Sequence, residues 1–443
     1  MRELLLELYG AALRAADPRA VVRRELAERP LESRAPVHIF AIGKAAVGMA
    51  EAALATLRDS KTAIAGGVVV GPAGTTARHS TLRISQGDHP LPGAASARAA
   101  DAVTEGVSVM PGDHQALVLL SGGASSLAAS PVDGVTPDDI AALWTFLLDS
   151  GQPIGTMNAI RKRCLRWGAG RLAAALSPRP VTVLCISDVI GDDPGTIASG
   201  PCAPDPRRAR EVLSLLESVA GARDIPVSVR RLLERQASGA LPDTLKPGDA
   251  TFRNVTTHVI ASNRLAVQGI ARRAQELGLS VLAGASDLSG EAREAGTRIG
   301  AFLRAGGGGA NCFVWGGETT VSLGSGPVGL GGRCQELALA AAAELEDVPG
   351  VALLAAGTDG RDGPTDAAGA LVDGTTWARI VGTGRDPDVG LTGHDAYHAL
   401  DAAGALLRTG LSGTNVMDVV IGLRQRGQPR DAHPPAAGSP PPG

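Results

Sequence analysis

The chain contains 443 residues, 44% of them hydrophobic, which is enough apolar material for two globular domains. A formal net charge of −3 and a pI of about 6.3 argue against a polyanion-binding surface, so no nucleic-acid partner is expected. Only four of the 42 basic residues are lysines, namely Lys44, Lys61, Lys162 and Lys246, and their scarcity makes each a candidate for a specific role.

Short apolar runs alternate along the chain with alanine-rich segments of helical periodicity. Segment 1–20 predicts an amphipathic helix and not a signal peptide, because Glu3 and Glu7 interrupt its apolar run. The alternation of strands and helices is typical of parallel α/β layers. The predicted strands are 37–43, 65–71, 116–123, 181–188, 255–262, 279–287, 311–317 and 351–359.

Composition shifts divide the chain into two predicted α/β domains. The segment 237–252 is rich in Pro and Asp and is the best linker, so we expect an N-terminal Rossmann-like domain over 1–248. A C-terminal α/β domain then covers 249–425. The segment 426–443 is rich in Pro and Gly without periodicity and predicts a disordered tail.

Two further features bear on location. No apolar run reaches the roughly 18 residues of a membrane helix, so no membrane partner is expected. The five cysteines show neither metal-ligand spacing nor a disulfide pattern, which favours a reducing, cytoplasmic compartment.

Lys44 stands in the sequence IGKAAVGM, where a predicted strand ends and a helix begins. A helix N-terminus favours anions, and a lysine added there suits a phosphate or carboxylate. The segment is not a Walker A motif, because Ala45 follows the lysine and the upstream glycine is missing. We interpret Lys44 as functional; a solvated lysine in the first helical turn is the alternative.

The next predicted strand end carries the sequence SGGASS. Its glycines and hydroxyls can present several backbone N–H donors to an anion, although an ordinary glycine turn is the alternative. The candidate cradle consists of Ser121, Gly122, Gly123, Ala124, Ser125 and Ser126.

A basic helix over 158–173 places Lys162 beside Arg161, Arg163 and Arg166. Such a charge run is usually a solvated face, and a ligand contact by Lys162 is the alternative.

Asp188 ends the predicted strand 181–188. A carboxylate held rigidly at a strand end suits a general base or a Mg²⁺ contact. Asp192 and Asp193 follow in a turn ended by Pro194, and we interpret both as turn-capping residues.

A glycine-rich loop over 324–332 leads from Glu318 into a helix whose first turn holds Arg333, Gln335 and Glu336. An arginine at a helix N-terminus suits a polyphosphate or an acid group. The sequence GSGPVG in this loop matches GxGxxG literally, but Pro327 and three further residues intervene before the helix, and no acidic residue ends a strand about 20 residues on.

Two more polar residues follow predicted strands. Asn263, or Ser262 before it, caps a helix or contacts a ligand. Asp359 lies in a loop with Asp362 and Asp366, where it reaches Mg²⁺ or a substrate hydroxyl or caps a turn. Anion cradles, strand-end carboxylates and a lysine spread over two domains together indicate phosphoryl transfer.

At this point the sequence resembles the class II glycerate 2-kinases, two-domain proteins that end in a MOFRL domain. The matching segments follow the family's order over roughly 3–423. They are IGKAA, GDHPLP (87–92), LLSGGASSL, SDVIGDDPGTIASGP, SNRLA, GGETTV, GGRCQELAL, GTDGRDGPTDAAGA and SGTNVMD (412–418).

The resemblance implies ATP- and Mg²⁺-dependent phosphorylation of D-glycerate at its 2-hydroxyl in a cleft between the domains. By position it implies that Lys44 contacts the transferring phosphate or the substrate, that Asp188 orients or deprotonates the hydroxyl, and that Arg333 binds a carboxylate or phosphate. It also implies that the remaining candidates line the nucleotide and substrate sites, namely Ser121 to Ser126, Asn263, Glu318, Gln335, Glu336 and Asp359.

Two features depart from the family pattern, since Cys334 replaces an asparagine and Met417 replaces another. Two other functions therefore stay open: an NAD(P)H-dependent hydroxypyruvate reductase, and a non-catalytic protein that binds glycerate or a nucleotide. The sequence leaves the oligomeric state open between monomer and homodimer.

Overall fold

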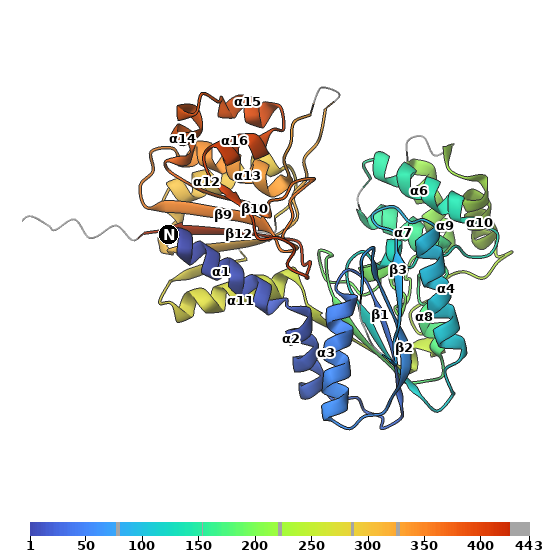
Figure 1. Cartoon of the computed structure of the whole chain (residues 1–443). Helices are drawn as coiled ribbons and strands as arrows, with labels where there is room; N and C mark the ends of the chain where they lie inside the picture. The colour runs from blue at the N-terminus through green and yellow to red at the C-terminus, as the bar shows by residue number, and fades with distance from the viewer. Residues whose placement is uncertain (77–79, 153, 220–223, 285–287, 325–327, 426–443) are drawn as a thin grey trace, which may run out of the picture.

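The computed structural model describes residues 1–76, 80–152, 154–219, 224–284, 288–324 and 328–425. The predicted tail over 426–443 lies outside the described residues. Figure 1 shows two lobes, each built around a β-sheet with helices on both faces. The predicted pair of α/β domains is confirmed.

The first sheet has six parallel strands in the order β3-β2-β1-β4-β5-β6. Strands β1 and β4 are buried along their whole length, as expected for apolar runs covered on both faces. The strands are β1 (Val37–Ile42), β2 (Ile64–Pro72), β3 (Arg83–Gly87), β4 (Gln115–Leu120), β5 (Val181–Ile186) and β6 (Val255–Ala261).

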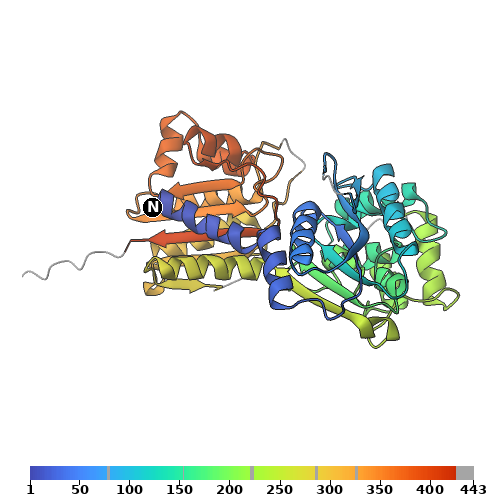
Figure 2. The same cartoon turned by 60° about the horizontal axis from the view of Figure 1, so that its bottom comes forward.

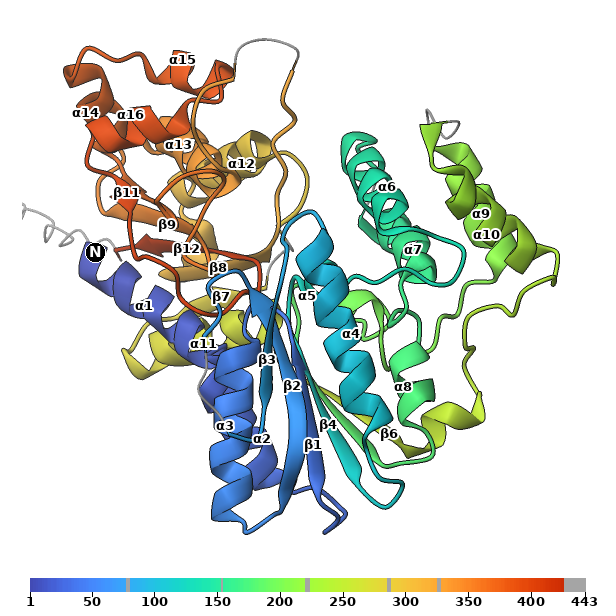
Figure 3. The same ribbon diagram turned by 45° about the vertical axis from the view of Figure 1, so that its right-hand side comes forward.

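Helices cover both faces of this sheet, and a separate helical group extends from its edge (Figure 3). On one face lie α2 (Pro18–Glu28) and α3 (Ala46–Asp59); on the other lie α4 (Ala94–Ser108), the short α5 (Ala124–Leu127) and α8 (Arg171–Leu176). The helical group consists of α6 (Pro137–Asp149), α7 (Ile154–Cys164), α9 (Ala209–Ser218) and α10 (Val227–Ala237).

The second sheet is mixed, with the order β11-β10-β9-β12-β8-β7. Among the described strands, β7 and β8 are the one pair of neighbours in this sheet that run parallel. Strand β12 lies between β8 and β9 and is antiparallel to both. The strands are β7 (Val281–Ala283), β8 (Cys312–Gly317), β9 (Val351–Gly357), β10 (Gly369–Asp373), β11 (Leu406–Leu407) and β12 (Asp418–Arg424).

Helices of the second lobe also form two layers. One face carries α1 (Arg2–Ala15) and α11 (Asn263–Glu276), which run side by side across the strands in Figure 2. The other face carries α12 (Ala292–Arg304), α13 (Arg333–Leu345), α14 (Thr376–Gly382), α15 (Pro387–Thr392) and α16 (Ala396–Ala402).

The division between the lobes does not follow the predicted linker. Strand β6 pairs with β5 although it lies beyond residue 248, so the change from the first sheet to the second comes after Ala261. The first helix, α1, packs on α11 and β12 of the second lobe. Among the described residues, no helix is both long and apolar enough to cross a membrane.

Candidate active site

The first sheet has the doubly wound strand order, whose direction of winding reverses between β1 and β4. Ligands of such sheets bind outside the carboxyl ends of the strands at this reversal point. Lys44 follows β1 and Ser121 follows β4, so the fold brings these two predicted site segments together.

Backbone contacts fix Lys44 against the loop after β4. The Lys44 N–H donates to the Gly122 carbonyl at 3.0 Å, and the Ala45 N–H donates to the Ser121 hydroxyl at 3.1 Å. Residue 43 must be glycine, because it has a φ of +132° and a Cβ there would meet Ser121 Oγ at 2.2 Å. The Lys44 side chain is exposed, and no described residue hydrogen-bonds or ion-pairs with it.

The SGGASS loop is held by its hydroxyls and leaves backbone donors free. The Ser125 and Ser199 hydroxyls lie 2.6 Å apart, and the Ser126 hydroxyl donates to the Pro90 carbonyl at 2.8 Å. Within the described part of the chain, the N–H groups of residues 122–125 have no acceptor. The hydroxyls therefore shape the loop, while the N–H groups of Gly122, Gly123, Ala124 and Ser125 are available to an anion.

Asp188 joins this cluster from the end of β5. Its Oδ2 lies 2.1 Å from the point that a Cβ on Gly122 would occupy, so only glycine lets the carboxylate approach the loop. Burial raises the pKa of the Asp188 carboxyl, and the Lys44 ammonium lowers it. Apart from its own backbone N–H, no described residue donates a hydrogen bond to this carboxylate.

The turn after Asp188 is organised by its own aspartates. The Asp193 carboxylate accepts from the Gly195 N–H at 3.0 Å and from the Thr196 hydroxyl at 2.7 Å, which is the turn-capping geometry predicted for it. Asp192 instead lies 4.0 Å from Arg264 at the start of α11, which connects this turn to the other lobe.

Sequence reasoning missed His89, whose ring lies beside the same loop. A Cβ on Gly123 would stand 3.0 Å from His89 Cδ2 and 3.4 Å from Lys44 Cε, so ring and lysine flank one glycine. The sequence GDHPLP was available as a signal, but it gave no chemical reason to select the histidine.

The second lobe contributes a cluster of opposite charges. Glu318 follows β8, Arg333 begins α13 and Asp418 begins β12. Arg333 binds Asp418 through two nitrogens, with Nε to Oδ2 at 2.5 Å and Nη2 to Oδ1 at 3.0 Å, and its Nη1 contacts Glu318. Asp418 was missed because SGTNVMD was treated as an uninformative loop.

The first-lobe residues Lys44 and Asp188 face the second-lobe cluster of Glu318, Arg333 and Asp418 between the lobes. Burial raises the pKa of Glu318, the Arg333 guanidinium lowers it, and the Asp418 and Asp188 carboxylates raise it further. Because Asp188 acts on Glu318 across the interface, the predicted cleft residues of both lobes are neighbours. A pocket of about 290 Å³ opens beside them, lined by residues 189–192 of the first lobe and by Asn263, Gly316, Gly317 and Met417.

The first turn of α13 is not open to a ligand as expected. The Asp362 carboxylate caps it, accepting from the Cys334 N–H at 3.1 Å and the Gln335 N–H at 2.8 Å. Burial and the Asp418 carboxylate raise the pKa of Asp362 to about 7. The Asp362 carboxylate therefore occupies the anion-binding position at the N-terminus of α13.

Gln335 and Glu336 have internal partners, although Glu336 also lines a pocket of about 450 Å³ with Glu318 and Arg333. Gln335 is fully buried, and its amide nitrogen donates to the Asp362 carbonyl at 3.2 Å and the Thr365 hydroxyl at 2.9 Å. Glu336 contacts His394 at 2.9 Å and Arg293 at 3.4 Å. Gln335 is thus held inside the lobe, whereas Glu336 stays a predicted ligand contact at the wall of that pocket.

Asn263 and Asp359 also have internal partners. The Asn263 amide donates to the Val416 and Asp418 carbonyls, both at 2.8 Å, and so fixes the segment that leads into β12. The half-buried Asp359 accepts from the Arg361 N–H at 3.0 Å. Asn263 is therefore a positioning residue for Asp418, and Asp359 caps a turn.

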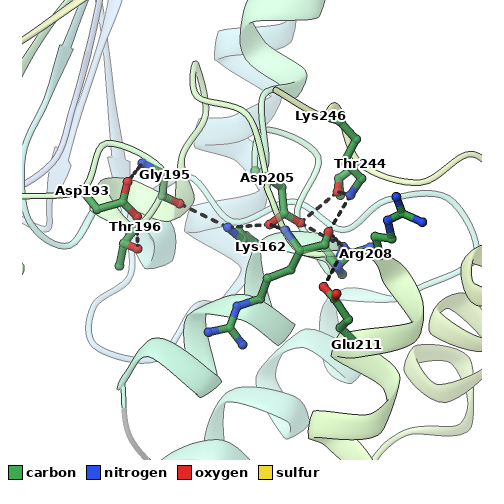
Figure 4. A network of polar contacts seen from close by, with 12 residues as sticks. Lys162, Asp193, Gly195, Thr196, Asp205, Arg208, Glu211, Thr244 and Lys246 are labelled. Carbon is green, nitrogen blue, oxygen red and sulfur yellow. Dashed lines mark hydrogen bonds and ion pairs between the residues drawn. The ribbon is translucent and has the colours of Figure 1, made fainter. Parts of the chain in front are cut away.

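Lys162 lies in a buried ion-pair network (Figure 4). Its ammonium lies 3.0 Å from Asp205 and donates to the Gly195 carbonyl at 3.4 Å. Asp205 also binds Arg163 at 3.0 Å, and both of these side chains are 0% exposed. The basic helix is therefore not a solvated face. Through the Gly195 carbonyl, Lys162 holds the turn that follows Asp188.

Two family models match the chain. The first, Domain of unknown function (DUF4147), matches residues 4–234, and the second, MOFRL family, matches residues 311–418. A D-glycerate 2-kinase of Thermotoga maritima is 36% identical, with 96% of this chain and 98% of the relative covered. The chain belongs to the class II glycerate kinase family.

Other relatives agree in length and fold. A glycerate 2-kinase of Pyrococcus horikoshii is 35% identical over 96% of this chain and 97% of its own. A putative hydroxypyruvate reductase of Agrobacterium vitis is also 35% identical, covering 94% and 93%. The crystal structure of the Thermotoga maritima glycerate kinase superimposes with a TM-score of 0.83 over 96% of this chain and 99% of that one.

The departures from the family pattern occupy different environments. Cys334 is the second residue of α13 and is buried in the core of the second lobe, where burial raises the pKa of its thiol well above the usual value. Met417 lines the pocket between the lobes and has a φ of +65°. Of the two substitutions, only Met417 can touch a ligand in that pocket.

Proposed function

We propose that this protein is an ATP-dependent glycerate 2-kinase that converts D-glycerate to 2-phospho-D-glycerate. The observation that carries the proposal is the juxtaposition of Lys44, Asp188 and the free N–H groups of residues 122–125 at the reversal point of the first sheet. A base, a cation and an anion cradle at one point are the groups that phosphoryl transfer needs. The kinase names of the relatives from Thermotoga maritima and Pyrococcus horikoshii support it.

In this mechanism Asp188 accepts the proton of the glycerate 2-hydroxyl as its oxygen attacks the γ-phosphorus of ATP. The raised pKa of the Asp188 carboxyl makes it a stronger base than an exposed aspartate. The Lys44 ammonium and the N–H groups of residues 122–125 stabilise the negative charge that builds on the transferring phosphoryl oxygens. The bond to the ADP oxygen breaks, and ADP leaves.

The donor set also fits a magnesium ion. Asp188 and Glu318 are carboxylates of different lobes, and the Asp188 carboxylate raises the pKa of Glu318. Arg333, which contacts Glu318, also binds Asp418. One or two carboxylates with substrate phosphates are a usual Mg²⁺ environment. Asp188, with Glu318, would hold the ion, which shields the charge of the ATP phosphates.

Arg333 is the residue that we assign to the glycerate carboxylate. Three of its five N–H donors contact Asp418 and Glu318, which leaves donors for a substrate anion. Its side chain is 35% exposed, so a ligand can reach it. Asp418 holds the guanidinium plane in place for this contact.

The proposal is tested by incubating the purified protein with ATP, Mg²⁺ and D-glycerate and identifying the product by ³¹P and ¹H NMR. We expect 2-phosphoglycerate and ADP in equal amounts. The 3-phosphate as sole product would overturn the regiochemistry. Binding of glycerate and ATP without phosphoryl transfer would instead support the non-catalytic binding protein.

Hydroxypyruvate reduction is the rival function, since a relative from Agrobacterium vitis carries that putative name. A nicotinamide enzyme needs a glycine-rich turn between a strand and a helix. Part of GSGPVG, residues 325–327, lies outside the described residues, but β8 ends at Gly317 and α13 begins only at Arg333. Oxidation of NADH or NADPH by hydroxypyruvate at an enzymatic rate would overturn the kinase proposal.

We also propose a cytoplasmic location, supported by the five cysteines, all of which are free and buried. A homodimer or a monomer is equally compatible with a site built from one chain. Sedimentation at the assay concentration distinguishes the two states.

A further inference from the structure

His89 is a histidine of the cleft that the proposed mechanism does not use. It lies just after β3, at the same edge of the first sheet as Lys44 and Ser121. His89 is partly exposed, and no described residue forms a hydrogen bond or ion pair with either of its ring nitrogens. An imidazole with two free nitrogens beside a binding loop is open to a ligand.

The backbone around His89 is held firmly, although its ring is free. Before it, the Asp88 carboxylate accepts from the Ala95 and Ser96 N–H groups at 2.9 and 3.3 Å at the start of α4. After it, the Pro90 carbonyl accepts from the Ser126 hydroxyl at 2.8 Å. The ring is therefore carried by a segment anchored on both sides, which is the preorganisation a binding group requires.

The ring edge faces the same place as Lys44. A Cβ on Gly123 would lie 3.2 Å from His89 Nε2 and 3.4 Å from Lys44 Cε, so both groups border the free N–H groups of the loop. Among the described residues, the Lys44 ammonium is the charge that acts on the His89 ring. A lysine next to a second cation is unfavourable, so the neutral imidazole is the form that suits this position.

We propose that His89 is a further substrate-binding residue of this site, donating an N–H hydrogen bond to the oxyanion that Lys44 and residues 122–125 bind. Partial burial and the Lys44 ammonium lower the pKa of His89, which keeps the ring neutral at pH 7. A neutral donor adds a directed bond to an anion without repelling the lysine. This inference rests on the proposed kinase function for the identity of the oxyanion.

Two anions of the reaction have this chemistry, and kinetics distinguishes them. Replacing His89 by alanine removes the donor, and we expect kcat/KM for glycerate to fall about tenfold or more, as for loss of a hydrogen bond to a charged group. A fall in kcat assigns the bond to the transferring phosphoryl group, and a rise in KM assigns it to the glycerate carboxylate. His89→Gln keeps an N–H donor near the Nε2 position and should restore part of the loss.

His398→Ala is the matched control, because His398 lies on α16 and pairs with Asp395 far from the loop. It should keep wild-type kinetics. Unchanged kcat and KM in both folded His89 variants, with an active wild-type enzyme, would overturn the inference.

A second measurement does not depend on kinase activity. The ¹H NMR titration of the His89 ring, assigned by its absence in His89→Gln, should move to a higher pKa in Lys44→Ala because the neighbouring cation is removed. An unchanged titration would contradict the juxtaposition of the two side chains. An inactive wild-type protein would overturn the proposed function, whereas this titration would still report on His89.

Discussion

At the scale of single residues, Lys44 and Asp188 carry the sharpest prediction. We expect Lys44→Ala and Asp188→Asn each to lower turnover with D-glycerate by at least about 10²-fold, the usual effect of losing one positioned charge or base. Steady-state kinetics at saturating ATP measures this. Lys61→Gln is the control for the lysine, since Lys61 is an exposed turn residue after α3.

The folded state of both variants is checked by thermal melting before their kinetics are compared. Turnover near the wild-type value in either folded variant would contradict its assigned role. A loss confined to KM would move that residue from chemistry to substrate binding.

Two histidines, His38 in β1 and His114 just before β4, lie at the amino ends of the strands of the first sheet. This pair predicts that the stability of the fold depends on pH. His38 Nε2 and His114 Nδ1 lie 3.0 Å apart, and burial, with His114 and Arg179, lowers the pKa of His38. The unfolded chain therefore binds the proton first, so stability is complete above about pH 6.5 and is lost as the pH falls below it.

Melting temperatures of the wild type and His38→Gln between pH 8 and 5 test this dependence. The variant should lose less of its melting temperature over that interval, because the group that titrates differently in the two states is gone. An equal loss in both proteins would rule out His38 as the source.

The four lysines show how far residue type leads. Their scarcity in the sequence made all four lysines candidates for a specific role, and only the structural environment distinguishes them. Lys44 is without a partner among the described residues, whereas Lys162 and Lys246 bind the aspartates of one network. Ion pairs join residues about 40 to 80 positions apart, as Arg163 does with Asp205 and Asp243. Local sequence carries no signal for such distances.

At the scale of elements, α7 depends on Asp205. This carboxylate, fully buried, binds Lys162, Arg163 and Thr244. We expect Asp205→Ala to lower the free energy of unfolding by about 3–5 kcal/mol, because Lys162 loses its carboxylate and the buried Arg163 keeps only Asp243 as an ion-pair partner among the described residues. Denaturant unfolding measures the change.

The control for Asp205 is Asp401→Ala, which removes an exposed ion pair with Arg408. Its cost should stay below about 1 kcal/mol. Similar values for the two variants would contradict the idea that burial, and not charge pairing alone, makes Asp205 important.

Most strands of the first sheet were predictable, because their apolar runs are buried on both faces and end in Gly, Ser or Asp. Strands β3, β10, β11 and β12 were missed. The run from Asp418 to Arg424 is as long as β9, which was predicted, so the strand itself was overlooked, whereas its insertion between β8 and β9 has no local signal. Because that pairing joins distant parts of the chain, the periodicity of the sequence cannot reveal it. For the same reason the sequence did not predict that the second sheet is mixed.

The same limit applies to the site. Lys44, Asp188 and residues 121–126 follow strand ends, and the strand order of a parallel sheet brings such ends together. Arg333 was selected for its charge, but its partner Asp418 is 85 residues away. The Asp362 carboxylate accepts from the N–H groups at the N-terminus of α13, where a ligand was expected to bind. A sequence motif does not show that these N–H donors already have an acceptor within the protein.

At the scale of the whole molecule, one apolar cluster runs through both lobes. It includes α1, α2, α3 and α11 and the facing residues of both sheets. Polar contacts reinforce it: the Tyr9 hydroxyl donates to the Gly357 carbonyl and the Thr414 hydroxyl to the Ala16 carbonyl, both at 2.7 Å. The lobes therefore share a core layer, which restricts how they move about the cleft.

We expect Tyr9→Phe to lower the free energy of unfolding by about 1–2 kcal/mol, because it leaves the buried Gly357 carbonyl without its donor. Urea denaturation followed by far-UV circular dichroism measures this. Leu4→Ala, at a partly buried position on the same helix, shows the cost of losing packing alone. An unchanged midpoint in Tyr9→Phe would contradict a stabilising role for this bond.

The position of α1 has a consequence for how the chain is made. This helix leaves the ribosome well before its packing surfaces are made, because α11 begins only at Asn263 and β12 only at Asp418. Its apolar face, with Leu5 and Leu8, has no partner until then. A nascent chain that is released before α11 and β12 are made would expose the apolar face of α1, which makes this helix a recognition site for chaperones and proteases that remove incomplete products.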